Sequence, residues 1–173
     1  MSEVSITMQR KNLFLMCGTP GSGKTTWITK QISESSVKSV HISRDAIRFA
    51  MVGEDEDYFA RETEVFNAFC SKIQEELEKE EAANIYVDAT HLNEKARNKV
   101  LDRLDLRNAD LYAVDFNMPL DVCIKQNALR SGRAFVPVSQ VRRMWHQYDA
   151  PTENEKYKYT VLHAVAQKEK EDN

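Results

Sequence analysis

Gly18-Thr19-Pro20-Gly21-Ser22-Gly23-Lys24-Thr25 fits the pattern GxxxxGK[ST], in which glycines let the backbone approach phosphate oxygens. It follows the apolar run 12–17, which predicts a strand buried on both faces, and it opens a predicted helix. A chance glycine-rich turn would leave that strand and that helix unexplained. The context therefore predicts a P-loop, whose backbone N–H groups enclose a phosphate.

Some residues of such a loop bind the donor phosphates, and others bind a metal ion. Lys24 is predicted to reach the β- and γ-phosphates, and Thr25 to place its hydroxyl on magnesium, with the helix N-terminus adding positive charge. Asp88 ends the apolar run 84–88, as expected of a magnesium ligand, although a turn or cap residue is the alternative. The expected cofactors are ATP, or another nucleoside triphosphate, and Mg²⁺. The predicted nucleotide-binding residues of the loop are Gly18, Gly21, Ser22, Gly23, Lys24, Thr25 and Thr26.

Length and composition indicate one domain. The 173 residues are 42% hydrophobic and 29% charged, which fits a single globular unit over 1–173. The apolar runs are far shorter than the roughly 20 residues of a membrane span, so we expect a cytoplasmic protein with no membrane contact. A net charge of −3 argues against nonspecific electrostatic binding along nucleic acid but is compatible with a local basic groove. Cys17, Cys70 and Cys123 lack metal-ligand spacing and are predicted to be reduced core thiols.

Strand-like and helical segments alternate along the chain. The longest helical segment, 58–83, carries apolar residues such as Phe59 and Phe66 at three- and four-residue steps, which predicts that they lie in the core. Further strands are predicted at 39–43, 110–116 and 159–162, and further helices from about residue 25, at 94–106, from 119 to about 131, and at 137–148. This alternation predicts a three-layer α/β P-loop fold with a mostly parallel five-stranded sheet. Ligands then bind beyond the carboxyl ends of the strands. Residues 168–173 are predicted to fray.

A candidate for the acceptor side follows the second predicted strand. The carboxylate of Asp45 should lie beside the P-loop, where it can accept a proton from an attacking hydroxyl. Arg48 lies one helical turn later, on the same face, and can hold an anion. The alternative is that Ser43 or Asp45 caps a short helix and Arg48 forms a solvated ion pair. No Asn-Lys-x-Asp guanine motif supports a regulatory GTPase.

Residues 122–148 contain no acid, and their Lys and Arg residues are Lys125, Arg130, Arg133, Arg142 and Arg143. With a flexible point at Ser131-Gly132, the segment predicts a helical lid that closes Arg130 and Arg133 over the transferring phosphate. A solvated basic face is the alternative. Trp145 either joins the core or stacks on a base, and segment 148–159 is a further candidate for base contact.

Four stretches together resemble the kinase domain of phage and bacterial polynucleotide kinases, and they span most of the chain. They are 18–27, the motif Ser43-Arg44-Asp45-x-x-Arg48, 87–90 and 127–137. The resemblance implies transfer of a nucleoside triphosphate's γ-phosphate to the 5′-hydroxyl end of DNA or RNA. It implies that Asp45 is the general base, that Arg48 binds the acceptor's phosphate, and that Arg130 is the lid arginine acting with Lys24 and Thr25 of the loop.

The resemblance also assigns Asp88 and Thr90 to substrate binding, but the sequence departs from the family pattern at one lid position. Gln126 stands where a second lid arginine often occurs. Arg133 is predicted to supply the missing charge, because three residues along a helix bring it near Arg130, unless Gly132 breaks that helix.

Two other functions remain open from the sequence. The same P-loop architecture serves kinases of small molecules and mononucleotides, including antibiotic and nucleotide-sugar phosphotransferases, and fold alone does not choose the acceptor. A nucleotide-binding module that acts through a partner protein is the third possibility. The oligomeric state is not predicted.

Overall fold

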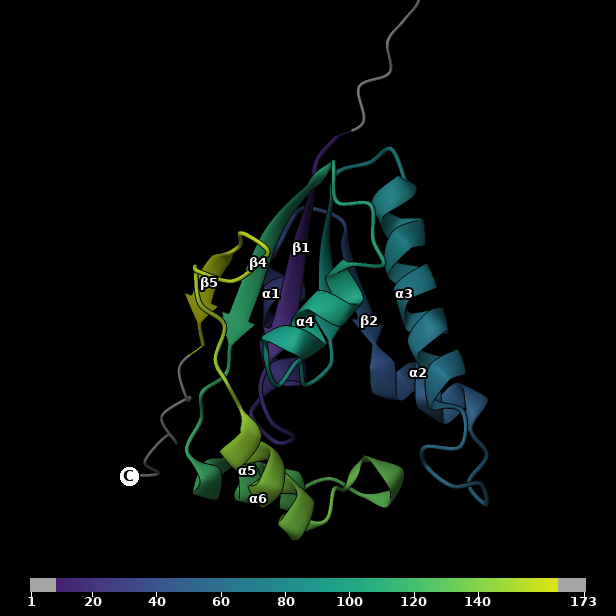
Figure 1. Cartoon of the computed structure of the whole chain (residues 1–173), viewed down its shortest axis with the longest axis vertical. Helices are drawn as coiled ribbons and strands as arrows, with labels where there is room; N and C mark the ends of the chain where they lie inside the picture. Colours follow the sequence, from purple (N-terminus) through teal and green to yellow (C-terminus); the bar gives the residue numbers. More distant parts are fainter. Residues whose placement is uncertain (1–8, 165–173) are drawn as a thin grey trace, which may run out of the picture.

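The computed structural model describes residues 9–164, in which five strands form one sheet (Figure 1). The strands are β1 (Lys11–Cys17), β2 (Ser39–Ser43), β3 (Ala83–Asp88), β4 (Ala109–Asp115) and β5 (Thr160–His163). Their order is β2-β3-β1-β4-β5, and every pairing is parallel. The predicted α/β fold is confirmed, and the sheet is parallel throughout the described residues. The predicted tail 168–173 lies outside them.

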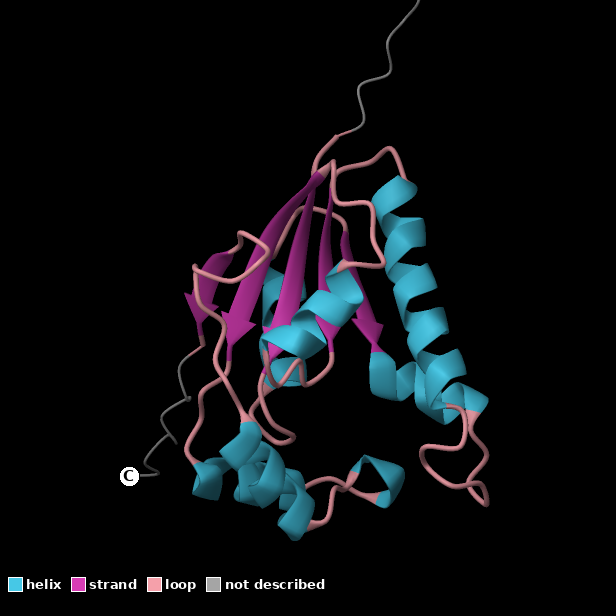
Figure 2. Ribbon diagram, in the orientation of Figure 1, coloured by secondary structure: helices cyan, strands magenta, loops and turns pink. Residues whose placement is uncertain are grey.

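Helices cover both faces of the sheet, as Figures 1 and 2 show. They are α1 (Lys24–Glu34), α2 (Arg44–Met51), α3 (Glu62–Glu78), α4 (Glu94–Leu101), α5 (Leu120–Ala128) and α6 (Val138–Gln147), with a short 3₁₀ turn, η1 (Gly132–Ala134). One core cluster joins the sheet to α3 and α4, through residues such as Phe69 and Leu101. A second joins the other face to α1 through Ile28. These are the three predicted layers.

β1 is central because its side chains are apolar on both faces. Leu13 and Leu15 enter the cluster under α3 and α4, whereas Met16 enters the cluster under α1. A strand buried on both faces reads as a continuous apolar run, which explains the sequence signal.

The three cysteines are buried and free, as predicted. Burial raises the pKa of the Cys17 thiol to about 12. These thiols are therefore core residues that stay protonated near neutral pH.

The first turn of the predicted helix 58–83 is absent, because α3 begins at Glu62. The Asp57 carboxylate accepts from the Phe59 N–H at 2.8 Å, and the Asp57 carbonyl accepts from the Ala60 N–H at 2.9 Å. An aspartate that bonds the backbone two residues ahead favours a turn over a helix. The prediction that Phe59 lies in the core was wrong, since it is 59% exposed, whereas Phe66 is buried.

Two other predicted helices end early. α4 ends at Leu101 instead of about residue 106. Directly after Leu101, tighter i→i+3 hydrogen bonds replace the helical ones. α5 ends at Ala128, and Gly132 adopts a left-handed φ of 59°. Arg130 and Arg133 therefore do not share a helical face, and the condition for their helical pairing, an unbroken helix, is not met.

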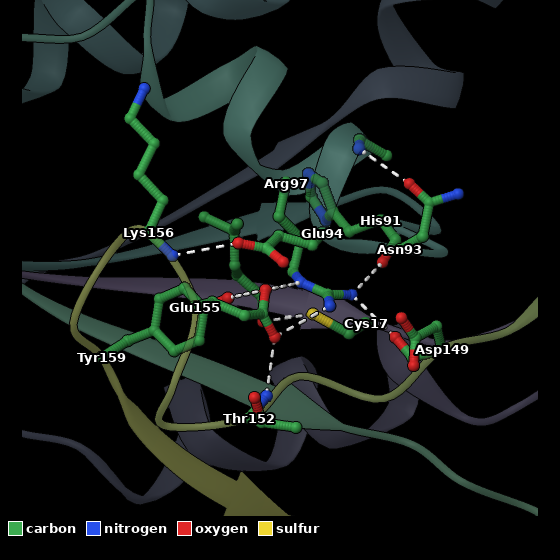
Figure 3. Close-up of polar contacts among 12 residues, drawn as sticks. Cys17, His91, Asn93, Glu94, Arg97, Asp149, Thr152, Glu155, Lys156 and Tyr159 are labelled. Atoms are coloured by element: carbon green, nitrogen blue, oxygen red, sulfur yellow. Dashed lines mark hydrogen bonds and ion pairs between the residues drawn. The ribbon is translucent and has the colours of Figure 1, made fainter.

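Trp145 and the segment after α6 pack against the body of the protein. The Trp145 indole joins the core cluster under α1 and donates to the Met118 carbonyl at 2.8 Å. Figure 3 shows how the segment between α6 and β5 is fastened: Arg97 of α4 donates to both oxygens of Glu155, at 2.9 and 3.0 Å. Arg97 also bonds the Asp149 carbonyl at 3.0 Å. Trp145 thus packs, partly buried, against the core, and segment 148–159 ties the lid helices to α4.

The arrangement directs the strand ends toward the lid. In Figure 2 the arrowheads of the sheet point toward α5 and α6, which Figure 1 labels, so the carboxyl ends of β1, β2 and β3 face the lid. No helix within residues 9–164 is long and apolar enough to cross a membrane.

Candidate active site

The phosphate loop joins β1 to α1 in a conformation that needs glycine. Gly21 and Gly23 have φ values of 79° and 92°, in the left-handed region that other residues avoid. At Gly18, an added Cβ would lie 2.7 Å from Phe116 Cβ. The Gly18 N–H donates to the Thr90 carbonyl at 2.9 Å, so the backbone of the predicted substrate residue Thr90 supports the loop.

Lys24 turns back over this loop. Its Nζ donates to the carbonyls of Gly18 at 3.0 Å and Thr19 at 2.9 Å. Burial lowers the pKa of Lys24, and the charge of Asp88 opposes that shift. No side chain caps α1 at Gly23 and no acid lies in its first turn, so its N-terminal N–H groups are available to an anion.

Thr25 and Asp88 meet beside the loop. Thr25 Oγ1 donates to Asp88 Oδ2 at 3.2 Å, and His41 Nε2 lies 2.8 Å from the same oxygen. Burial opposes ionisation of Asp88, but the His41 bond and the Lys24 charge outweigh it and lower the pKa of this carboxyl. A hydroxyl and an ionised carboxylate are the oxygen ligands that Mg²⁺ prefers, so the residues fit that ion.

Sequence reasoning missed His41. β2 and β3 are neighbours, and their register places Ser43 opposite Asp88, so that a residue near the end of β2 reaches this carboxylate. The order of strands in the sheet is the signal that would have found it.

Asp45 and Arg48 share the first turns of α2, as predicted. Ser43 caps the helix by accepting from the Ala46 N–H at 3.1 Å, so the capping alternative holds for Ser43 and leaves the Asp45 carboxylate for other partners. Asp45 Oδ1 accepts from Arg48 Nη1 at 2.7 Å and from Tyr58 Oη at 3.0 Å. Both bonds end on one oxygen of the carboxylate.

Arg48 is held firmly in the wall of the site. Its Nη2 donates to both oxygens of Glu62, each at 2.8 Å, and its guanidinium lies 4.6 Å from the centre of the Tyr58 ring. The Nε atom is buried and has no partner among residues 9–164. Burial opposes ionisation of Glu62, but Arg48 and Arg44 lower its pKa. Arg48 is thus buried and preorganised instead of solvated. The apolar periodicity placed Tyr58 and Glu62 in a helix that packs on the core, so the sequence did not indicate that they contact Arg48.

The two lid arginines lie in different surroundings. Arg130 is half-buried and lines the same cavity as the phosphate loop. Burial is the main cause that lowers the pKa of Lys24, and the charge of Arg130 lowers it further. Arg133 crosses to the C-terminal end of α2, where it donates to the carbonyls of Val52 at 2.7 Å and Phe49 at 2.9 Å. Its guanidinium also stacks 4.6 Å from the Phe49 ring centre. In this structure Arg133 joins the lid to α2.

One cavity of about 1410 Å³ brings the predicted site residues together, apart from Gly18, which lies outside its lining. It is larger than the roughly 300–1,000 Å³ of an ordinary ligand pocket. Its lining includes Lys24, Thr25, Asp45, Arg48, Asp88, Thr90, Arg130 and Arg133. Arg142 and Arg143 are exposed and lie outside that lining, so the solvated alternative holds for them.

Solved structures share this fold. A chain of the Pnkp1/Rnl/Hen1 RNA repair complex aligns with a TM-score of 0.65 and 20% identity, over 84% of this chain and 46% of that one. A fungal RNA kinase aligns with a TM-score of 0.62 and 16% identity, over 93% and 77% of the two chains. A gluconokinase from Sinorhizobium meliloti 1021 aligns with a TM-score of 0.55 and 13% identity, over 91% and 85%. At these identities the likeness shows the fold alone, and the chain spans less than half of the repair-complex chain it matches.

No curated protein matches the chain. A family model described as an AAA domain matches residues 13–151, from β1 through α6 to the start of the segment fastened by Arg97. That match includes the phosphate loop, α2 and the lid, and it spans well over half of the sequence. The chain therefore belongs to this AAA domain family of P-loop proteins.

Proposed function

We propose that this chain is a single P-loop kinase domain of the cytoplasm that transfers the γ-phosphate of ATP, or of another nucleoside triphosphate, to the 5′-hydroxyl end of DNA or RNA. The observation that carries the proposal is the 2.7 Å bond between Asp45 and Arg48 inside the cavity that also contains Lys24. A carboxylate base and an anion-binding guanidinium thus face the phosphate donor side by side.

The donor binds at the phosphate loop. Lys24 and the uncapped N-terminus of α1 hold the β- and γ-phosphates. Thr25 and Asp88 would hold Mg²⁺, which supplies positive charge to the phosphate oxygens when bound. His41 fixes the Asp88 carboxylate from the neighbouring strand.

Transfer is a displacement at the γ-phosphorus. The 5′-hydroxyl oxygen forms a bond to the γ-phosphorus while its proton passes to Asp45, and the bond from the γ-phosphorus to the bridging oxygen breaks, releasing the nucleoside diphosphate. The bonds from Arg48 and Tyr58 orient the Asp45 carboxylate through Oδ1. Arg130 neutralises the charge that spreads over the transferring group.

Arg48 distinguishes an oligonucleotide from a free nucleoside. A polynucleotide end carries a phosphate one nucleotide from its 5′-hydroxyl, and Arg48 lines the cavity beside Asp45. Glu62 holds the guanidinium in place. The RNA repair complex and the fungal RNA kinase among the structural neighbours support a nucleic acid acceptor.

The experiment that tests this proposal compares two activities of Arg48→Ala. We expect transfer to a 5′-hydroxyl oligonucleotide to fall far more than basal nucleotide hydrolysis, because Arg48 acts on the acceptor. Arg142→Ala, an exposed arginine outside the cavity lining, is the matched control. Thermal unfolding of both variants separates binding from folding. Equal loss of both activities in a folded Arg48→Ala would assign Arg48 to the donor or to the fold.

A kinase of a small-molecule or mononucleotide hydroxyl is the second candidate. The observation that favours it is that both terminal nitrogens of Arg48 already bond protein carboxylates, Nη1 with Asp45 and Nη2 with Glu62. An arginine so occupied suits an acceptor without a phosphate. This candidate predicts phosphate transfer to nucleosides or sugars and none to a 5′-hydroxyl oligonucleotide.

A further inference from the structure

Phe59 is a large apolar side chain on the acceptor side of the cavity. It is 59% exposed, yet it lines the same cavity as Asp45 and Arg48. Single exposed apolar residues are common on protein surfaces and need no explanation. Phe59 differs because its neighbours hold it in a fixed position beside functional groups.

The backbone and the ring of Phe59 are both constrained. The Asp57 carboxylate accepts from the Phe59 N–H at 2.8 Å and fixes the turn before α3. The Phe59 ring packs edge to face with the Tyr58 ring, at 4.8 Å between centres and 82° between planes. Tyr58 is fixed in turn by its hydrogen bond to Asp45. The exposed ring is therefore preorganised, which lowers the entropy cost of stacking a ligand on it.

The ring also lies next to the group that we assign to the acceptor phosphate. The Arg48 guanidinium is 5.8 Å from the centre of the Phe59 ring. In a polynucleotide a base is joined to its backbone phosphate through one sugar. A phosphate on Arg48 therefore brings a base to the edge of the cavity where Phe59 is exposed.

The geometry points to Phe59 as a stacking platform for one of the first two bases of the acceptor strand, an inference that rests on the proposed function. A cationic group that holds the backbone, beside an aromatic ring that stacks a base, is how proteins bind single-stranded nucleic acid without reading its sequence. A sugar acceptor has no π-face to stack. Phe59 thus selects for a polynucleotide end, with little preference among the four bases.

The test measures kcat/KM for phosphate transfer to three 5′-hydroxyl oligonucleotides of equal length. One is intact, and the others carry an abasic residue at the first or the second position. With the wild-type protein we expect about a 10-fold loss on one abasic strand, as for a stacked base. Phe59→Ala should lower kcat/KM on the intact strand by the same factor. It should cause no further loss on that abasic strand, because the effects of coupled groups are not additive.

Two further variants make the result specific. Phe59→Trp keeps an aromatic face and should retain the discrimination between intact and abasic strands. Val37→Ala, which shortens an exposed apolar side chain outside the cavity lining, should behave as wild type. Thermal unfolding shows whether each variant is folded.

Two outcomes would overturn the inference in different ways. If Phe59→Ala and both abasic changes lower kcat/KM independently, the base does not stack on Phe59, and the proposed kinase function still stands. If the wild-type protein phosphorylates none of the three strands, the proposed function fails first and the platform fails with it.

Discussion

Arg48 and Asp45 are joined across one turn of α2, with 2.7 Å between Nη1 and Oδ1. The same guanidinium is held from the other side by Glu62, at 2.8 Å to each oxygen. A charged pair at this spacing on an exposed helix contributes little, but here Arg48 is buried and its partners fix its orientation. The candidate base and the candidate phosphate-binding group are therefore positioned together by one network.

Asp45→Asn tests the base directly. An amide keeps the shape and the acceptor oxygen but does not take up a proton, so we expect transfer to fall about 100-fold or more. Nucleotide binding should be retained, because Lys24 and the phosphate loop are untouched. A transfer assay and a nucleotide-binding titration check both expectations. Asp105→Asn, in an exposed pair with Arg107, is the matched control. Full transfer activity in Asp45→Asn would exclude Asp45 as the base.

Arg130→Ala tests the charge of the lid. Since Arg130 and Lys24 line the same cavity, loss of the Arg130 charge should lower kcat by roughly 100-fold while changing the KM for nucleotide much less. Steady-state kinetics with varied nucleotide separates the two constants. An unchanged kcat would show that the transferring phosphate does not depend on Arg130.

Arg133→Ala separates two roles for the second lid arginine. If Arg133 supplies the charge absent at Gln126, kcat should fall as in Arg130→Ala. Its bonds to the Val52 and Phe49 carbonyls favour a contact that holds the lid on α2, so we expect a rise of about 10-fold in the KM for the acceptor and a smaller change in kcat. A wild-type kcat in Arg133→Ala would exclude the charge role.

His91 makes stability depend on pH. Burial lowers its pKa to about 4, and its Nδ1 lies 2.6 Å from the Met16 carbonyl. Below the unfolded pKa, near 6.5, the unfolded chain binds a proton that the folded protein excludes, so stability falls as pH drops from about 6.5 to 4. The loss should reach about 3 kcal/mol.

Urea unfolding between pH 4 and 7 measures this loss. His91→Asn removes the titrating ring and tolerates the positive φ of 40° at this position, so its stability should vary less over that range. His146→Gln, at an exposed histidine, should keep the wild-type slope. An equal slope in His91→Asn and wild type would assign the acid sensitivity to other groups.

Arg97 is expected to matter for stability more than any exposed arginine. It is fully buried, and its loss would leave the Glu155 carboxylate buried without its partner (Figure 3). Arg97→Met should lower the free energy of unfolding by about 3–5 kcal/mol, against about 1 kcal/mol or less for Arg107→Ala in its exposed pair. Urea unfolding of both variants gives the comparison, and similar losses would contradict it.

Short sequence motifs correctly predicted the features that depend only on neighbouring residues. The phosphate loop needs glycines at fixed positions, and Asp45 and Arg48 meet because they are three residues apart on one helix. The same reasoning failed where one residue interrupts a periodic pattern. The Asp57 turn exposes Phe59, and the end of α5 at Ala128, followed by the left-handed Gly132, leaves Arg133 off the lid helix.

Contacts between distant segments were beyond local reasoning. The bond between His41 and Asp88 depends on β2 and β3 being neighbours, and the Arg97–Glu155 pair joins residues 58 positions apart. Both depend on packing of the whole sheet, which sequence periodicity does not specify. They add positioning groups around the candidate site residues that the motifs predicted.

The most direct test of the central claim is transfer of labelled γ-phosphate from ATP, with magnesium, to matched oligonucleotides bearing a 5′-hydroxyl or a 5′-phosphate, beside a free nucleoside. We predict label on the 5′-hydroxyl strand, none on the 5′-phosphate strand, and far less on the nucleoside, which lacks the phosphate that Arg48 binds. Label on the nucleoside alone would contradict the account and identify a small-molecule kinase.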